Sequence, residues 1–326
     1  MKTVRIGTTE MTANAVGLGC MGFSHAYGAP TPREEAVRTI RQAFEMGYNF
    51  FDTAECYTGI NEDGSVSYNE ELVGEALKDV RDQVIICTKF GVAHKGDHLE
   101  TDSSPETIRK SVEGSLKRLG TDYIDVYYQH RIDPAVEPET VAQVMKELME
   151  EGKIRAWGIS ETTEEYLRRA HAVCPVSCIQ NRYSMMARWY ESIFPVCEEL
   201  GVTYVAFSPL ANGALSGSVK PAETYGKDDF RARMPQYEAE QIEKTQKMLD
   251  TMGEIASAHN ATSAQLSLAW MINKKDFILP IPGSRKLSRL QENYNAGNIE
   301  LSGEEVKRLD DILDTMDFAV FGGSRK

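Results

Sequence analysis

The stretch VIICTK at residues 84–89 decides the fold, because it is an apolar run that closes on a single charged residue, Lys89. Two further runs have the same form: YNFFD at residues 48–52 closes on an aspartate, and DVYYQH at residues 125–130 closes on a histidine. Short apolar runs of this length are typical of buried strands in a parallel sheet. Neighbouring parallel strands end at the same rim, so we expect the three polar side chains to meet there.

Runs of this kind recur along the whole chain, each followed by a loop and by an amphipathic helical pattern. They end near Gly19, Asp52, Lys89, His130, Ser160, Asn181, Phe207 and Pro280. Eight such units in 326 residues predict a single (β/α)8 TIM barrel domain over residues 1–326, with its functional rim at the carboxyl ends of the strands. Residues 4–13 are expected to form a β-hairpin before the barrel. Long loops at 91–103 and 211–243 would lie on the functional rim.

Helix starts carry their own signals. Ser104 followed by Pro105 predicts an N-cap and a proline in the first turn of a helix. Thr162 with Glu165 reads as a capping box for a later helix. The spacing of Val37, Ile40 and Phe44 predicts a helix over residues 33–46.

The polar residues at the predicted rim make a proton-transfer site. Tyr57 follows Asp52 by five residues, so a phenol joins the carboxylate, the ammonium of Lys89 and the imidazole of His130. The ammonium is expected to lower the proton affinity of the phenol, the carboxylate to hold the ammonium, and the imidazole to hydrogen-bond a substrate oxygen. This chemistry suits carbonyl reduction, in which an arriving hydride needs a matching proton. The alternatives are a surface lysine after a strand and a merely structural histidine.

Composition excludes several classes of partner. The net charge of −13 argues against nucleic acid and against anionic membranes, which attract basic faces. The N-terminal residues show no apolar segment of a signal peptide, and no run reaches the length of a transmembrane helix. We expect a cytoplasmic protein acting on a small molecule, with its oligomeric state open.

The six cysteines are scattered, and most lie in apolar runs. We interpret them as reduced and buried. His171, Cys174 and Cys178 are close enough in sequence to raise the possibility of a metal site, but a strand over 176–179 favours a structural role, and no metal is predicted.

The segment GLGCMG at residues 17–22 matches the glycine fingerprint of dinucleotide-binding Rossmann folds. In that fold a helix opens at the third glycine. Here Pro30 and Pro32 precede the next helical pattern, and the acid at Asp52 comes too late. The fingerprint is therefore treated as a decoy, and Gly19 and Gly22 as positions where backbone approaches a ligand.

Several motifs together resemble the aldo-keto reductases, in particular the bacterial and yeast-type members. They are DTAECY at 52–57, TKF at 88–90, YQH at 128–130, LKRLGTDYID at 116–125, and GKIR and GISE at 152–155 and 158–161. The resemblance runs from about residue 16 to residue 293. It implies a barrel that reduces an aldehyde or ketone with NADP(H), with Tyr57 as proton donor and Asp52, Lys89 and His130 as the other catalytic residues.

The resemblance also implies how an extended nicotinamide cofactor would bind across the rim. Ser160 and Gln180 would hold the carboxamide, Phe207 would stack on the nicotinamide ring, and Met21 would pack near it. The remaining cofactor residues, implied by matching position, are Asp52, Ser208, Pro209, Leu210, Gly283, Ser284, Arg285, Arg289, Glu292 and Asn293. The hydroxyl and three cations of residues 284–289 would form an anion site for the adenosine 2′-phosphate, which predicts NADPH over NADH. The alternative reading of these cations is a solvated helix start.

Two departures from the family pattern stand out. Arg182 occupies a position where many relatives have glutamate, so the charge is reversed and substrate preference or loop packing is expected to differ. Residues 58–67 form an unusually long segment beside Tyr57, either a cover for the substrate or a mobile surface turn. The apolar tail at 317–323 would either close over the substrate or fasten the chain end to the barrel wall.

Two other functions remain open from the residues. One is a barrel lyase or aldolase in which Lys89 forms a Schiff base. The other is a nicotinamide-binding regulatory protein on the same barrel, which multiple turnover would exclude.

Overall fold

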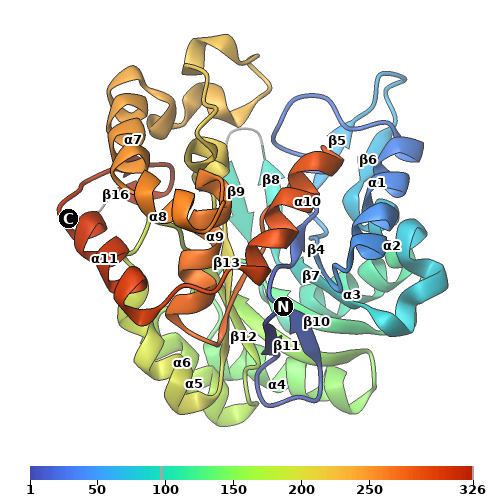
Figure 1. Ribbon diagram of the computed structural model, residues 1–326. Coiled ribbons are helices and arrows are strands. Elements are labelled where there is room, and N and C mark those ends of the chain that lie inside the picture. The colour runs from blue at the N-terminus through green and yellow to red at the C-terminus, as the bar shows by residue number, and fades with distance from the viewer. Residues whose placement is uncertain (96–97, 325–326) are drawn as a thin grey trace.

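Eight parallel strands form the central sheet of the computed structural model, which describes residues 1–95 and 98–324 (Figure 1). In chain order they are β3 (Leu18–Gly19), β4 (Phe50–Asp52), β7 (Ile85–Phe90), β10 (Ile124–Gln129), β11 (Ile154–Ser160), β12 (Cys178–Arg182), β13 (Thr203–Phe207) and β14 (Ile278–Pro280). Neighbours in the sheet follow the chain order from β3 to β14. The two edges meet through backbone hydrogen bonds from Gly17 N to Pro280 O at 2.9 Å and from Gly19 N to Pro282 O at 3.3 Å. The sheet therefore closes on itself, and the expected (β/α)8 barrel is confirmed.

Helices surround this sheet on the outside (Figure 1). They are α1 (Arg33–Met46), α2 (Asn69–Leu77), α3 (Pro105–Leu119), α4 (Pro138–Glu150), α5 (Glu164–Val173), α6 (Phe194–Leu200), α7 (Ala239–Thr251), α8 (Gly253–Ala258), α9 (Ser263–Lys274), α10 (Leu287–Asn295) and α11 (Gly303–Asp314). The Ser104 side chain accepts from Thr107 N, as expected of an N-cap. The capping box expected at Thr162 was wrong by one residue, because Thr163 caps α5 and accepts from Tyr166 N.

The glycine fingerprint proved to be a decoy. The element directly after β3 is a single-turn 3-10 helix, η1 (Met21–Phe23), and the first α-helix, α1, begins only ten residues after η1 ends. Gly19 is needed for close packing between strands, since a Cβ there would lie 2.8 Å from Ile281 O. Gly19 and Gly22 both line the cavity described below, and the expected approach of their backbone to a ligand stays a prediction.

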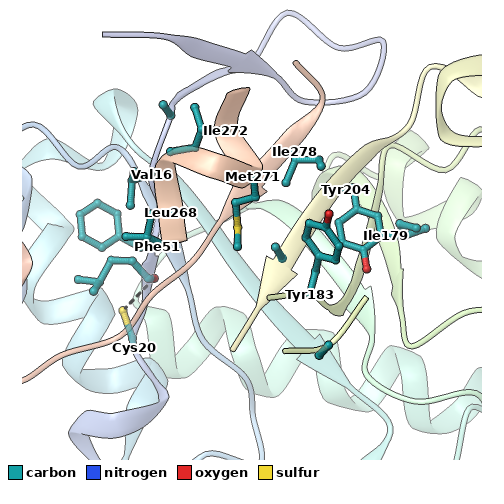
Figure 2. Close-up of a cluster of buried hydrophobic side chains, with 14 of the residues drawn as sticks. Val16, Cys20, Phe51, Ile179, Tyr183, Tyr204, Leu268, Met271, Ile272 and Ile278 are labelled. Atoms are coloured by element: carbon teal, nitrogen blue, oxygen red, sulfur yellow. Dashed lines mark hydrogen bonds between the residues drawn. The ribbon is translucent and has the colours of Figure 1, made fainter. Parts of the chain in front are cut away.

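Side chains alternate between the inside and the outside of the barrel along each strand. On β4, Phe50 belongs to the inner apolar cluster and Phe51 to the outer one that packs against the helices. Figure 2 shows part of the outer cluster, where Phe51, Leu268 and Met271 come from both strands and helices. The same alternation turns the last side chains of the strands inward, which places polar groups at the rim.

The other end of the barrel is closed by the expected hairpin, β1 (Thr3–Arg5) and β2 (Thr12–Asn14). Val4, Ile6 and Ala13 pack into the inner cluster, and Gly7 N donates to Thr203 Oγ1 at 2.8 Å. This end is filled by apolar side chains, and the cavity described below opens at the opposite rim.

Irregular segments build up that rim. Two antiparallel hairpins are β5 (Thr58–Ile60) with β6 (Val66–Tyr68), and β8 (Val92–Lys95) with β9 (His98–Thr101). After β13 the chain forms short 3-10 helices, η4 (Ala211–Ser216), η5 (Ala222–Thr224), η6 (Phe230–Arg233) and η7 (Pro235–Tyr237). The loop expected at 211–243 thus ends earlier, because α7 begins at Ala239. A last hairpin, β15 (Ala319–Val320) with β16 (Gly323–Ser324), forms the tail.

The cysteines carry no disulfide: all six are free, and five are buried. Within residues 1–95 and 98–324 no group of three or more His, Cys, Asp or Glu side chains could hold a metal. His171 instead accepts from Val176 N at 3.1 Å and fastens the turn after α5. None of the helices described is both long and apolar enough to cross a membrane.

Candidate active site

A buried ion pair forms the floor of the site. Lys89 Nζ lies 2.6 Å from Asp52 Oδ1 and donates to Thr53 O at 2.7 Å. Gln180 Nε2 donates to the other oxygen, Asp52 Oδ2, at 2.7 Å. Burial alone would lower the pKa of Lys89, but the Asp52 carboxylate and the neighbouring Tyr57 outweigh it and leave that pKa raised. The lysine is therefore a fixed ammonium at neutral pH.

Tyr57 lies above this pair on the loop after β4. Its hydroxyl is 3.5 Å from Lys89 Nζ, and Nζ lies 5.0 Å from the centre of its ring. Backbone bonds hold the loop: Tyr57 O accepts from Ser24 Oγ at 3.0 Å and from Asn69 N at 3.0 Å. Burial raises the pKa of Tyr57 to about 12, although Lys89 acts in the lowering direction. The lowering expected from the ammonium is present, but desolvation of the phenolate outweighs it and leaves the pKa of Tyr57 raised.

His130 faces Tyr57 across the site. The two rings meet edge to face with their centres 5.6 Å apart. Nδ1 of His130 lies 3.5 Å from Cys56 Sγ. Burial raises the pKa of the Cys56 thiol to about 12, so the sulfur is neutral at physiological pH. This contact was not predicted from the sequence, although Cys56 directly precedes Tyr57.

The predicted residues meet in one cavity of about 550 Å³. Tyr57, Asp52 and His130 line one end, and Lys89 is fully buried beneath them. All of the predicted cofactor residues also line this cavity: Met21, Asp52, Ser160, Gln180, Phe207, Ser208, Pro209, Leu210, Gly283, Ser284, Arg285, Arg289, Glu292 and Asn293. A channel between a proton donor and a polar, partly cationic far end suits an elongated ligand that carries negative charge.

Ser160 and Gln180 occupy the middle of this channel at the ends of neighbouring strands. Ser160 Oγ donates to Gln180 O at 2.9 Å and accepts from Arg131 Nη1 at 3.2 Å. Phe207 closes β13, and Ser208 adopts a positive φ of 52°, which turns the chain sharply along the cavity wall.

The cations at the far end have different surroundings. Arg285 donates to three backbone carbonyls, Gly22 O at 2.5 Å, Ala29 O at 3.0 Å and Tyr27 O at 3.1 Å, so it joins two rim segments. Arg289 pairs with Glu292 at 2.6 Å.

Ser284 Oγ accepts from Lys286 N at 3.1 Å. The Lys286 side chain is exposed, and in the described chain no acid lies within ion-pair distance of it. Of the three cations of the predicted anion site, Arg285 and Arg289 thus already have partners in the described chain.

A roof over the cavity joins segments about 200 residues apart. Tyr27 and Asp229 form a β-bridge, and Phe230 N donates to Ala26 O at 3.0 Å. Asn212 Nδ2 donates to the Tyr27 hydroxyl at 2.9 Å. These residues were not identified from the sequence, because nothing local in either segment marks the other as its partner.

The tail is fastened to the barrel, and its expected closure over a substrate stays a prediction. Phe318 and Val320 are buried in the outer cluster, whereas Phe321 lines the cavity. Phe321 N donates to Gln236 Oε1 at 2.9 Å, which attaches the tail to the roof. In the described chain, the hairpin at 58–68 contributes no residue to the cavity wall, and its expected role as a cover for the substrate stays a prediction.

Comparisons with known proteins agree with this geometry. Residues 15–314 match the family model described as the aldo/keto reductase family. A curated relative from Glycine max, "Probable aldo-keto reductase 1", is 36% identical over 322 residues, covering 98% of this chain and 91% of the relative.

Solved structures agree as well. The glycerol dehydrogenase AKR11B4 from Gluconobacter oxydans superimposes with a TM-score of 0.85 at 28% identity, covering 96% of this chain and 95% of that one. An aldo/keto reductase from Klebsiella pneumoniae, solved with NADP and acetate, gives a TM-score of 0.72 at 28% identity, covering 96% and 95%.

Proposed function

Because this chain belongs to the aldo/keto reductase family, we propose that it is an oxidoreductase that reduces an aldehyde or ketone to an alcohol with NADPH. The observation that carries the proposal is the buried series Asp52–Lys89–Tyr57, which ends in a protonated phenol at the cavity wall. A hydride added to a carbonyl carbon leaves an alkoxide, which needs a proton from a nearby donor.

The residues of the cavity fit a nicotinamide cofactor. Gln180 and Ser160 present amide and hydroxyl groups that match a carboxamide, and the Phe207 ring offers a face for stacking. The cavity continues from there to the serine and cations of residues 284–289. The bound cofactor would supply the hydride. The Klebsiella relative was crystallised with NADP.

Each catalytic side chain then has a definite task. Tyr57 donates its proton to the carbonyl oxygen as negative charge develops there. His130, held edge to face against Tyr57, orients that oxygen. Lys89 stabilises the phenolate that is left behind, and Asp52 keeps the ammonium in position.

The Schiff-base alternative is disfavoured by the state of Lys89. A Schiff-base lysine must lose its proton to attack a carbonyl, and its pKa is usually lowered. Here the pKa of Lys89 is raised, and its ammonium already donates to Asp52 and Thr53.

A panel of aromatic, aliphatic and polyhydroxy carbonyls, followed by loss of NADPH absorbance, tests the proposal. We expect multiple turnovers with at least one class. NADPH binding without turnover on any carbonyl would instead support a regulatory protein on the same barrel.

A further inference from the structure

Arginines are frequent around the cavity, and most are neutralised or saturated by partners. Arg131 pairs with Glu161 at 3.2 Å, Arg231 with Asp229, and Arg289 with Glu292. Arg285 donates to three backbone carbonyls. Each of these guanidinium groups therefore already has a partner within the protein.

Arg182 is different. It is 7% exposed and lines the cavity, yet within residues 1–95 and 98–324 no carboxylate pairs with it, and its Nε is a buried donor without an acceptor. Burial lowers the pKa of Arg182, but a guanidinium remains charged at physiological pH. An unpaired buried charge is costly, so its retention calls for an anion that arrives with a ligand.

The fold directs this guanidinium into the cavity. Arg182 is two residues beyond Gln180 on β12, so the strand alternation puts both side chains on the inner face. Its Cζ lies 4.9 Å from the ring centre of Phe207 and 5.6 Å from that of Phe321. The two rings provide weak cation–π stabilisation but no hydrogen-bond acceptor.

The tail leaves room for the guanidinium. A Cβ at Gly322, whose φ is +94°, would lie 2.9 Å from Arg182 Nε. The guanidinium is thus enclosed between the nicotinamide-stacking candidate Phe207 and the tail, at the substrate end of the channel.

We propose that Arg182 binds a carboxylate carried by the carbonyl substrate, so that the preferred substrates are oxo-acids. This inference rests on the proposed reductase function. The planar fork of a guanidinium matches the two oxygens of a carboxylate, and the water-poor surroundings strengthen the contact. Arg182 is therefore a specificity residue, and the proton transfer is left to Tyr57.

A pair of matched substrates tests the proposal: 4-oxobutanoate and butanal differ by the carboxylate. Arg182→Met keeps an apolar stem of similar length and removes the charge. We expect kcat/KM for 4-oxobutanoate to fall about 10- to 100-fold, with butanal within about threefold, because a charge-assisted contact is lost. Arg182→Lys should give an intermediate loss, since the charge stays but the fork is gone.

Three results would overturn the assignment. The first is a ratio of kcat/KM for 4-oxobutanoate to kcat/KM for butanal that is the same in Arg182→Met as in the unmodified protein. The second is an increased KM for NADPH that accompanies equal losses on both substrates, which would make Arg182 a cofactor contact. The third is a loss of kcat/KM in Arg182→Met for glyceraldehyde 3-phosphate relative to glyceraldehyde, with no loss for 4-oxobutanoate relative to butanal. Arg182 would then bind a phosphate and not a carboxylate.

Tail packing needs its own control. Phe321→Ala removes one ring from Arg182 and keeps the charge. We expect it to change both substrates alike; a selective loss on 4-oxobutanoate equal to that of Arg182→Met would show that tail packing, and not the charge, sets the preference.

Binding measured without turnover separates this inference from the proposed function. The NADP⁺ complex is titrated calorimetrically with butyrate and, as the neutral match, with butyramide. Butyrate should bind the unmodified protein more tightly than butyramide, and Arg182→Met should weaken butyrate by about 10-fold or more. Equal butyrate binding in both proteins overturns the role of Arg182 even if aldehydes are reduced. Absence of any carbonyl reduction with butyrate binding intact overturns the proposed function instead.

Discussion

Two buried cations, Lys89 and Arg182, lie near the carboxyl ends of strands β7 and β12, and they differ in what surrounds them. Lys89 has a carboxylate, a backbone carbonyl and a phenol within 3.5 Å. Arg182 has two aromatic rings and no acceptor for its Nε among the described residues. A cation that the fold neutralises acts on the protein's own groups, whereas one that the fold leaves unpaired is available to a ligand.

The largest expected difference is in stability. Lys89→Met leaves the buried Asp52 carboxylate without its counter-ion, which should destabilise the protein by about 3–5 kcal/mol. Arg182→Met removes an unpaired buried charge, so the free energy of unfolding should stay the same or rise. Urea unfolding gives the free energy of unfolding of both variants. Equal destabilisation would contradict the proposed difference between the two cations.

The next effect concerns catalysis at the neutralised cation. Tyr57→Phe removes the proton donor but no buried charge, so kcat should fall on the order of 100-fold or more while cofactor binding changes little. Steady-state kinetics and NADPH titration check the two parts. Wild-type kcat in this variant would remove Tyr57 from its assigned role.

A third prediction extends the comparison to Arg289, a half-exposed cation at the end of the cavity away from Tyr57. Arg289 is already paired with Glu292, yet it lines the same cavity as Ser284. Arg289→Ala should raise the KM for NADPH about 10- to 150-fold and leave NADH nearly unaffected, because charge-assisted contacts to a phosphate are lost. Equal kcat/KM for the two cofactors in the unmodified protein would show a solvated helix start instead.

The smallest expected effect is on pH dependence. Burial raises the pKa of Tyr57 to about 12. A donor is protonated below its pKa and is lost as the pH rises through it, so Tyr57 should impose no decline on kcat/KM between about pH 6 and 9. The pH profile at saturating NADPH is the measurement. A descending limb in that range that disappears in Tyr57→Phe would contradict the burial argument.

The strand ends could be predicted because their signals are local. Alternation along β4 and β7 follows from the sequence, and it fixes that Asp52 and Lys89 point inward once the barrel is assumed. The cap of α5 shows the limit of such signals. Thr162 and Thr163 offer the same hydroxyl, and only the backbone geometry decides which one caps.

The rest of the site depends on contacts distant in sequence. The Tyr57 pKa reflects desolvation by segments that pack around it, so the lysine in its motif was a misleading guide. The roof joins Tyr27 to Asp229, and no pattern in either loop encodes the other. Arg182 was visible as a departure from the family, but that its Nε has no acceptor among the described residues is a property of the fold.

The central claim is that this barrel transfers a hydride to a carbonyl and that Tyr57 supplies the proton. NADPH carrying deuterium at both C4 positions, incubated with a carbonyl from the panel, tests it most directly. One deuterium should appear on the carbinol carbon of the product, formed over many turnovers by the unmodified protein and about 100-fold more slowly by Tyr57→Phe. Tight binding of the deuterated cofactor without deuterium in any alcohol would show that the protein does not transfer a hydride to these carbonyls.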